Sequence, residues 1–467
     1  MQPSPHHQRN PALERSALLV ATLTSFMGPF MISSVNVALP AIQKDLDMDA
    51  VQLSWIATAY LLAVAIGLVP SGKIADIHGR KKVFATGLAV YTAGSAAAIL
   101  AHSAFFLIAT RVFQGLGAAM FVTTGMAILT SIFPGKERGR VIGIYVAAVY
   151  IGLSVGPFAG GLLTQYLGWR SIFWVMLPLG GMSLAMTLYF LRGEWRGEEG
   201  QKFDMIGSLL YMTAIFGLVY GATLLPQQTG ILLSLAGAAL LCLFVRHQLT
   251  ARFPVFDVQL FVRNKTFAFS SLAALLNYSA TFAVTFLLSL YLQYIKAMTP
   301  QTAGTVLMAQ PVMMALLSPL AGRLSDRIEP RLPASGGMLV TTIGVALFSL
   351  LGPATPTPLI VANLILLGTG FALFSSPNMS AIMGAVDRSD YGLASGAVAT
   401  MRLLGQMFSM ATATVVLSLI VGRQTITEAN YDLFLHSIKI VFTISALLCF
   451  CGVFFSWFRG SLHGKGV

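Results

Sequence analysis

Charge is the scarce ingredient of this 467-residue sequence. Only 10% of the residues are Asp, Glu, Lys or Arg, whereas 56% are hydrophobic and the mean hydropathy is +0.77. Soluble domains carry roughly 25% charged residues, so the chain has too few charges to cover a surface in contact with water. This composition excludes a soluble enzyme or binding protein. The lipid bilayer is the expected solvent for most of the side chains.

Other features are missing as well. The three cysteines, Cys242, Cys449 and Cys451, lie in apolar stretches and show neither a disulfide framework nor a metal-ligand spacing. No Walker lysine motif is present, so ATP is not the expected energy source. Residues 1–15 lack a secretory signal pattern, which makes the first apolar run a retained span. We therefore expect no metal and no cofactor.

Long apolar runs fill most of the chain. A helix needs about 20 mostly apolar residues to cross a bilayer, and short gaps between such runs predict antiparallel neighbours. We predict an all-α membrane protein with fourteen transmembrane helices. The windows are 16–39, 53–72, 82–100, 104–126, 140–164, 171–191, 205–224, 229–249, 267–294, 302–322, 336–352, 358–380, 394–420 and 436–458.

Basic residues divide unevenly between the gaps. With the N-terminus in the cytoplasm, 22 of the 29 Lys and Arg residues lie in cytoplasmic segments, five lie outside, and Arg111 and Arg402 lie within spans. This bias follows the positive-inside rule, and the even number of spans places both termini in the cytoplasm. The net charge of +12 is thus a topology signal rather than a sign of nucleic-acid binding. We expect a multi-pass protein of the cell membrane, which is the inner membrane in a Gram-negative host.

A weak internal repeat is visible. Gly72-Lys-Ile-Ala-Asp76 closes the second window and Gly322-Arg-Leu-Ser-Asp326 closes the tenth. Chance is the alternative explanation, but the matching positions favour two six-helix halves with two helices inserted between them. The expected divisions are a tail at 1–15, a first half at 16–191, a linker with the inserted helices at 192–266, a second half at 267–458 and a tail at 459–467.

The gap after the second window places one acid among several bases. Asp76 is followed by Gly79 and Arg80. An ion pair of Asp76 with a nearby Arg, or its contact with a helix N-terminus, can hold one conformation and break in another. A solvated basic loop is the alternative. We predict a role in conformational gating for Gly72, Asp76, Gly79, Arg80, Gly322 and Asp326.

Two arginines lie inside spans. Arg111 lies about 10 Å from the outer end of its window and Arg402 about 12 Å from the cytoplasmic end of its own. A charge at such depth is costly and indicates function, although either side chain could reach the headgroups by snorkelling. Gln114 shares the face of Arg111. We predict proton coupling or a substrate counter-charge for Arg111, Gln114 and Arg402.

Small and polar residues mark further positions within the spans. Glycines four apart permit close helix packing, and a proline kinks a helix; the fifth window holds both kinds, at Gly152, Gly156, Pro157, Gly160 and Gly161. Polar side chains in spans more often bond to a neighbouring helix than to a ligand. Candidates for lining a central cavity are Asn36, Asn277, Gln310, Asn378 and Gln406.

These stretches, in this order, resemble the major facilitator superfamily, and in particular its fourteen-helix branch of drug:proton antiporters. The resemblance extends along the whole chain and includes Asn36-Val-Ala-Leu-Pro40 and Gly168-Trp169-Arg170. It implies the major facilitator fold, with gating by Asp76, proton transfer linked to Arg111, and alternating access supported by the Gly-Pro kink around Pro157.

One departure from the branch concerns charge. Exporters of cationic drugs in this family usually carry an Asp at the position of Met31, and no acidic residue of this chain lies deep in a span. A cation in a low-dielectric site needs an anionic partner, so a dedicated site for organic cations is disfavoured. Neutral or anionic amphiphiles become more plausible substrates. Aromatic and Met side chains could still hold a cation by cation–π contacts.

The function expected from these observations is secondary active transport, not catalysis. We predict export of small amphipathic or drug-like compounds, coupled to the proton gradient, by a monomer whose partners are the bilayer, its substrate and protons. An importer or uniporter of a neutral or anionic metabolite is the alternative. A membrane-embedded lipid-modifying enzyme is more distant, because it needs a cluster of His, Asp or Glu near an interface and none is visible.

Overall fold

Long helices dominate the computed structural model, which describes residues 11–133, 135–198, 200–386 and 391–460. Within those ranges fourteen helical segments are long and apolar enough to cross a membrane, which confirms the predicted class. They are α1 (Pro11–Leu46), α2 (Ala50–His78), α3 (Arg80–Ile99), α4 (Ala104–Ile132), α5 (Gly135–Leu167), α6 (Arg170–Phe190), α7 (Met205–Thr223), α8 (Gln228–Thr250), α10 (Lys265–Leu290) with the π-helical η1 (Tyr291–Ile295), α11 (Pro300–Leu307) with α12 (Ala309–Ser325), α13 (Arg331–Phe348), α14 (Thr357–Gly384), α15 (Tyr391–Ile420) and α16 (Tyr431–Phe458). The short α9 (Gln259–Arg263) and the 3-10 helix η3 (Glu428–Asn430) complete the described elements.

Most helices extend a few residues past the expected windows, as α2 does to His78, and the first and tenth spans differ in further ways. The first continues to Leu46, past Pro40, and is therefore longer than 16–39. The tenth is interrupted at Met308, between α11 and α12. Pro311 lies in the first turn of α12, where its missing N–H costs no helical hydrogen bond. The interruption thus coincides with a residue that favours a helix start.

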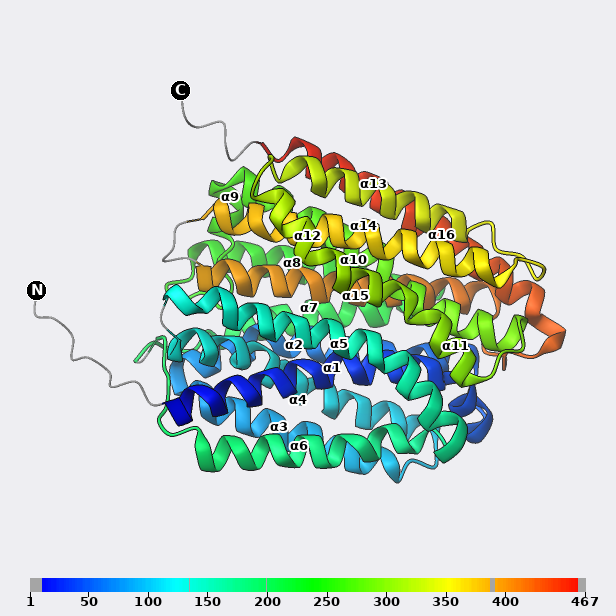
Figure 1. Cartoon of the computed structure of the whole chain (residues 1–467), viewed down its shortest axis with the longest axis horizontal. Coiled ribbons are helices and arrows are strands. Elements are labelled where there is room, and N and C mark those ends of the chain that lie inside the picture. The colour runs from blue at the N-terminus through cyan, green and yellow to red at the C-terminus, as the bar shows by residue number, and fades with distance from the viewer. Residues whose placement is uncertain (1–10, 134, 199, 387–390, 461–467) are drawn as a thin grey trace, which may run out of the picture.

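The helices form two bundles with the same internal packing. In Figure 1, α1 to α6 make up the lower bundle and α10 to α16 most of the upper one. Gly117 of α4 packs against the backbone of Gly87 in α3, and Gly370 of α14 packs in the same way against Gly337 in α13. A Cβ at any of these positions would overlap backbone atoms, so glycine permits both close approaches. This repetition supports two related halves, whereas the expected division points at 191/192 and 266/267 stay predictions.

The inserted helices α7 and α8 lie beside the seam between the halves. Tyr211 of α7 donates a hydrogen bond from its hydroxyl to the Ala65 carbonyl of α2, at 2.9 Å, and Trp55 packs against Tyr220. On the other side, α7 and α8 border a groove of about 370 Å³ against α15 and α16, with mostly apolar residues such as Leu218 and Phe408 in its walls. The pair is thus bonded to the first half and in apolar contact with the second.

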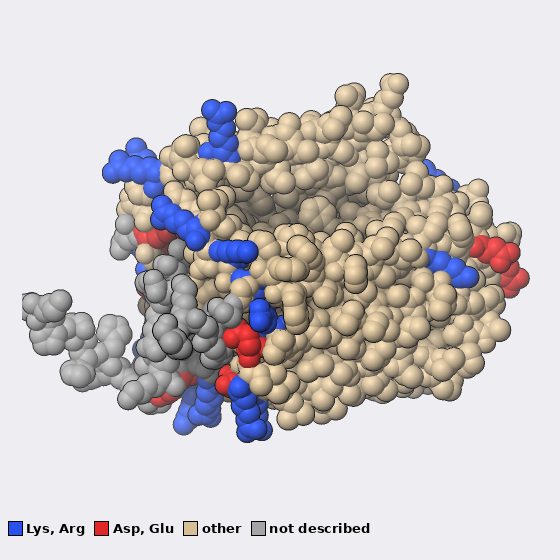
Figure 2. Space-filling model, turned by 90° about the horizontal axis from the view of Figure 1, so that it is seen from above, with Lys and Arg blue, Asp and Glu red and all other residues tan. Residues whose placement is uncertain are grey.

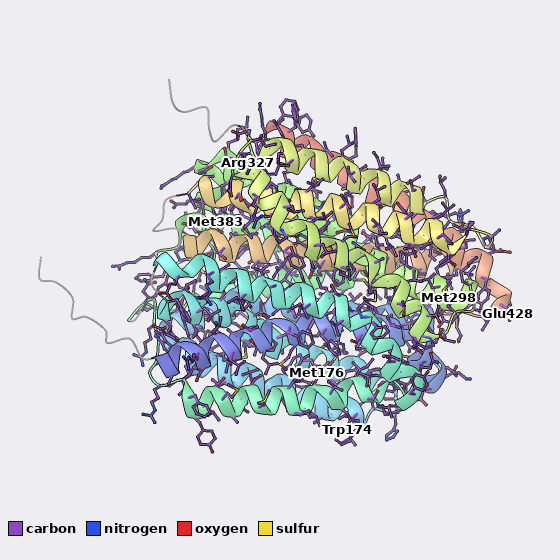
Figure 3. All side chains as sticks on the ribbon, viewed as in Figure 1. Trp174, Met176, Met298, Arg327, Met383 and Glu428 are labelled. Carbon is purple, nitrogen blue, oxygen red and sulfur yellow. The ribbon has the colours of Figure 1, made fainter. Side chains whose placement is uncertain are left out.

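The two ends of the helix bundle differ in charge. The start of α1 and the end of α16 lie at the same end, together with Arg327 and Met383, whereas Met298 and Glu428 mark the opposite end (Figures 1 and 3). Figure 2 shows Lys and Arg gathered mainly at the first end, and a long surface between the ends without charged residues. We name the first end the basic end. The uncharged belt is the surface expected in contact with lipid.

Candidate functional site

Hydrogen bonds between the two halves are concentrated toward the end opposite the basic end. Ser289 of α10 donates to the Asn36 carbonyl of α1 at 2.7 Å, and the amide of Gln293 donates to the Val37 carbonyl at 2.9 Å. The hydroxyls of Thr58 in α2 and Thr414 in α15 lie 3.3 Å apart, and both residues are fully buried. These contacts close the space between the halves at that end.

The glycine-rich stretch of α5 contributes to the same closure. Gly152, Gly156 and Gly160 lie against α1, close to Phe26, Ser33 and Ser34 respectively. On another face of α5, Gly161 approaches the Pro300 carbonyl of α11, and the Pro157 carbonyl lies against Gly304. The predicted antiporter stretch therefore packs one helix of its own half and one helix of the other half. Its role in transport stays a prediction.

Toward the basic end, the halves separate. On α15, the partly exposed residues Ser395, Ala399, Arg402 and Gln406 follow helical spacing and form one stripe, which ends below the buried Thr414. Similar stripes of partly exposed residues reach Ile32 on α1 and Thr285 on α10, and the next residues, 33–39 and 286–290, are buried. The three stripes end at similar depth. A solvent-accessible space therefore opens from the basic end toward the middle of the molecule.

Arg402 lies within this space, among hydroxyl groups from both halves. Its guanidinium lies near the hydroxyl of Tyr278 of α10, which in turn lies near Ser375 of α14. Tyr145 of α5, from the first half, lies within the electrostatic range of Arg402. Among the described residues, no carboxylate pairs with Arg402. The structure thus places this predicted residue between the halves.

Arg111 is sealed inside the first half instead. It is 1% exposed, donates from Nε to the Ile56 carbonyl at 3.2 Å and from Nη1 to Gln114 Oε1 at 2.7 Å, and lies 4.3 Å from the ring centre of Tyr60. The Nε2 amide of Gln114 in turn donates a hydrogen bond to Ser95 Oγ at 2.7 Å. We name Arg111, Gln114 and Ser95 the polar triad. Snorkelling of Arg111 is excluded by this burial.

The second half has no such triad at the equivalent positions. Gly94 of α3 packs on Gln114, whereas its counterpart Gly344 of α13 packs on Leu367 of α14. The same register aligns Arg111 with Leu364 and Ser95 with Val345, and all three counterparts are buried apolar residues. The fold itself therefore does not require polar groups here. This asymmetry favours a role of the triad beyond packing, and the predicted role in proton coupling stays a prediction.

The loop after α2 forms a hydrogen-bonded network within the first half. Asp76 Oδ1 accepts from Nε of Arg80 at 2.8 Å and from its Nη2 at 2.7 Å, while Nη1 of Arg80 donates to Ser131 Oγ of α4 at 2.6 Å. Gly79 has φ +120°, a conformation that favours glycine. A Cβ at Gly72 would meet nothing within 4 Å, so packing does not explain this glycine. The gating role of these four residues stays a prediction.

The linker between α6 and α7 is docked on this loop. The amides of Gly197 and Glu198 donate to the Asp76 carbonyl at 3.1 and 3.0 Å, and the amide of Lys81 donates to Glu194 Oε1 at 2.7 Å. Lys73, whose side chain is 7% exposed, forms an ion pair with Glu198. The acidic residues of the linker thus neutralise bases of the loop. The sequence pattern did not single out these acidic residues.

The second copy of the motif is arranged differently. Gly322 lies in α12 with its α-carbon facing Ser376, and Asp326 caps the end of the helix in an exposed position. In the described part of the chain Asp326 forms no ion pair. Only the first copy is locked by a carboxylate in this conformation.

The predicted cavity residues have different environments. Gln406 is partly exposed on the stripe of α15, whereas Asn36, Asn277, Gln310 and Asn378 are buried. Asn378 bonds to the Ser270 carbonyl at 3.0 Å and accepts from Arg459 at 2.7 Å. Their part in binding substrate stays a prediction.

Arg459 was missed by the sequence reasoning, which counted it as a cytoplasmic topology charge. It follows α16 directly, yet its side chain turns inward and is 1% exposed. Burial lowers the pKa of Arg459 to about 10, against the opposing charge of Glu329. Its position beside a span end carried no signal of this inward turn.

Comparison with known proteins agrees with this architecture. The family model described as Major Facilitator Superfamily matches residues 21–410 and 270–466. The chain belongs to the major facilitator superfamily. A solved structure of a POT family transporter in complex with 5-aminolevulinic acid superposes with a TM-score of 0.71 at 15% identity, over 94% of this chain and 96% of that one. The expected fold is thereby confirmed.

Relatives within the superfamily include several drug-efflux proteins. Multidrug resistance protein Stp of Mycobacterium tuberculosis is 33% identical over 87% of this chain and 77% of its own length. Methylenomycin A resistance protein of Streptomyces coelicolor is 33% identical over 85% of both chains. Riboflavin transporter RibZ of Clostridioides difficile is 31% identical over 85% of this chain and 86% of its own. The protein is therefore a membrane transporter of the superfamily, as predicted.

Proposed function

We propose that this transporter exports small amphipathic compounds from the cytoplasm in exchange for protons, by alternating access. The observation that carries the proposal is the arrangement of the halves, which are bonded to each other at one end and separated at the basic end. The positive-inside rule assigns the basic end to the cytoplasm. The conformation is then inward-facing, with both termini in the cytoplasm.

The direction of transport is supported by the named relatives. Two of the three are resistance proteins, whose names describe protection from a drug or an antibiotic. RibZ, described as a riboflavin transporter, favours the second candidate, which is uptake of a metabolite. Both candidates use the same inward-facing and outward-facing states. They differ in which gradient drives the cycle.

Proton coupling is proposed through the polar triad. No Asp or Glu of the described residues lies in the inner part of a span, so a membrane carboxylate is not the obvious proton carrier. The triad is a buried polar chain whose equivalent positions in the second half hold apolar residues. Proton movement that alters its hydrogen bonds would shift the balance between the two states.

The test is a transport assay with purified protein in liposomes. Vesicles preloaded with a panel of amphipathic dyes and antibiotics are diluted into buffer at the same pH or at a different one, and exchange is followed. We expect counterflow without a gradient and net movement driven by a pH gradient across the membrane. Exchange that ignores the gradient would exclude proton antiport while leaving transport intact. Riboflavin as the only transported compound would favour the uptake candidate.

A further inference from the structure

Arg402 differs from the other two interior arginines in being partly exposed between the halves. Arg111 is sealed against backbone, amide and aromatic partners, and Arg459 is 1% exposed against Asn378. A guanidinium has five N–H donors. Arg402 is therefore the one of the three that a ligand in the space between the halves can contact.

The groups around Arg402 are neutral. They are the hydroxyls of Tyr278 and Ser375 from the second half and the phenol of Tyr145 from the first. Hydroxyls can donate to an anion that Arg402 holds, and two halves that both contribute to a site can be drawn together by one ligand. Further along the exposed stripes, Phe26 of α1 and Phe282 of α10 offer apolar surface. The space thus combines one cation with hydroxyls and aromatic rings.

Among the residues that the structure describes, no acidic side chain forms an ion pair with Arg402. The acidic residues of the described spans lie at helix ends, as Glu14, Asp45 and Asp432 do. An unpaired cation surrounded by low-dielectric protein attracts anions and repels cations. A charge-assisted bond from Arg to a carboxylate or sulfonate is also among the stronger hydrogen bonds in proteins. Electrostatics in this space therefore selects by the sign of the ligand charge.

We infer that Arg402, with Tyr278, binds the anionic group of the substrate, and that the substrate class is amphipathic anions carrying a carboxylate, sulfonate or phosphate. The inference rests on the proposed function only in taking the space between the halves as the substrate path. The aromatic remainder of the substrate contacts the partly exposed phenylalanines. Neutral analogues bind more weakly and organic cations more weakly still.

A charge series with one ring system tests this inference. Binding of 2-naphthoate, its neutral methyl ester and the cation 2-naphthylmethylammonium is measured by calorimetry on the full-length protein in phosphatidylcholine nanodiscs. The anion should bind tightest. Arg402→Gln should weaken its binding about ten- to hundredfold, the size expected for one charge-assisted bond, and leave the ester within twofold. Arg402→Lys should retain part of the affinity, because the positive charge is kept but the planar guanidinium, which can bind a carboxylate through two hydrogen bonds, is lost.

Arg423→Gln is the matched control, because Arg423 lies exposed after α15 at the opposite end. It should bind like the wild type. The charge assignment is wrong if 2-naphthoate does not bind, if the cation binds equally well, or if Arg402→Gln leaves anion binding unchanged while the protein keeps its melting temperature.

Two further experiments distinguish a lipid headgroup from substrate at Arg402, and anion binding from proton-coupled transport. Nanodiscs that contain phosphatidylglycerol test for a lipid headgroup at Arg402, and loss of naphthoate binding in them would overturn the assignment to substrate. Binding needs no proton gradient, so the effect of Arg402 on binding is tested independently of transport. Liposomes that show no pH-driven exchange, although Arg402 governs binding, would refute the proposed antiport and leave the anionic site in place.

Discussion

At the scale of single residues, burial separates three arginines that the sequence presents alike. Arg111, Arg402 and Arg459 all adjoin apolar residues, and depth alone marked the first two as functional. The structure seals Arg111 in a polar triad, leaves Arg402 partly exposed and turns Arg459 inward. Sequence position gives depth along a helix but not the direction of a side chain at a helix end. For that reason the role of Arg459 could not be predicted.

The polar triad can be tested by replacing it with the residues of the other half. The variant Ser95→Val, Arg111→Leu, Gln114→Leu copies Val345, Leu364 and Leu367. We expect it to fold with a melting temperature equal to or above that of the wild type, because well-packed apolar residues often replace buried charged groups without loss. Transport should fall below a tenth of the wild-type rate. Thermal unfolding and liposome exchange are the measurements.

The single change Arg111→Ala serves as the comparison. It leaves Gln114 and the Ile56 carbonyl without their partner, and the unfolding free energy should fall by about 1–3 kcal/mol. If the triple variant transports like the wild type, the triad is only packing.

At the scale of elements, the linker between α6 and α7 is docked on the segment for which we predict a gating role. Its backbone and acidic side chains bond to the loop after α2 through Asp76, Lys73 and Lys81. Hydropathy placed the linker between spans but could not show where it docks, since contacts between distant segments leave no periodic signal. We infer that the linker stabilises the loop in the inward-facing conformation.

Exchanging the charges of one pair tests the docking of the linker. Glu198→Lys places a second cation beside Lys73, whose side chain is 7% exposed, and should undock the linker. We expect faster trypsin cleavage within 192–202 and a several-fold loss of transport, since a buried uncompensated charge is strongly destabilising. The double variant Lys73→Glu, Glu198→Lys should recover both properties. Failure of the double variant to recover either one would mean that the ion pair does not hold the linker.

The start of α7 should respond to acid. Burial opposes ionisation of Asp204, but hydrogen bonds from the Gly207 amide, His247 and Gln248 outweigh it and hold the pKa of this carboxyl below its usual 3.8. A lowered folded-state pKa means that stability is fully present above pH 3.8 and is lost as pH falls through the lower value. Amide protection at the α7–α8 ends, taken relative to the intrinsic exchange rate at each pH, should therefore hold from pH 7 to about 4 and fall only below it.

Asp204→Asn is the comparison for this acid response. The neutral amide cannot titrate, so exchange at the α7–α8 ends should be raised at all pH values, by about 1–3 kcal/mol of local opening, with no further rise in acid. An acid response that persists unchanged in the variant would assign it to another group.

At the scale of the whole molecule, hydropathy predicted the class and the number of spans correctly, and the ordered motifs indicated the correct family. The sequence could not predict at which end the two halves touch. The residues in those contacts, such as Ser289, Thr58 and Thr414, are ordinary polar residues of spans. The break at Met308 was also missed, since the apolar run is continuous there. The conformational state depends on contacts between pairs of helices, and the sequence of one helix does not reveal these contacts.

A crosslink across the closed end tests the cycle. In a variant without native cysteines, Thr58→Cys with Thr414→Cys should form a disulfide, because the two hydroxyls lie 3.3 Å apart across the halves. Oxidation should stop transport and reduction should restore it. The control pair Ser335→Cys with Ser456→Cys lies within the second half at 2.8 Å, and its oxidation should leave transport unchanged. Transport by the oxidised Thr58–Thr414 variant would show that this end does not open.

The groove between the inserted helices and the second half bears on the speed of that cycle. In the described ranges no hydrogen bond joins α7 or α8 to α15 or α16, and the walls include Leu218, Ala411 and Val415. Hydrogen bonds fix a register, whereas apolar surfaces in lipid can shear past each other with little change in free energy. The inserted helices α7 and α8 can thus move with the first half and slide along α15 and α16. Friction at this surface, rather than bond breaking, would then set its contribution to the turnover time.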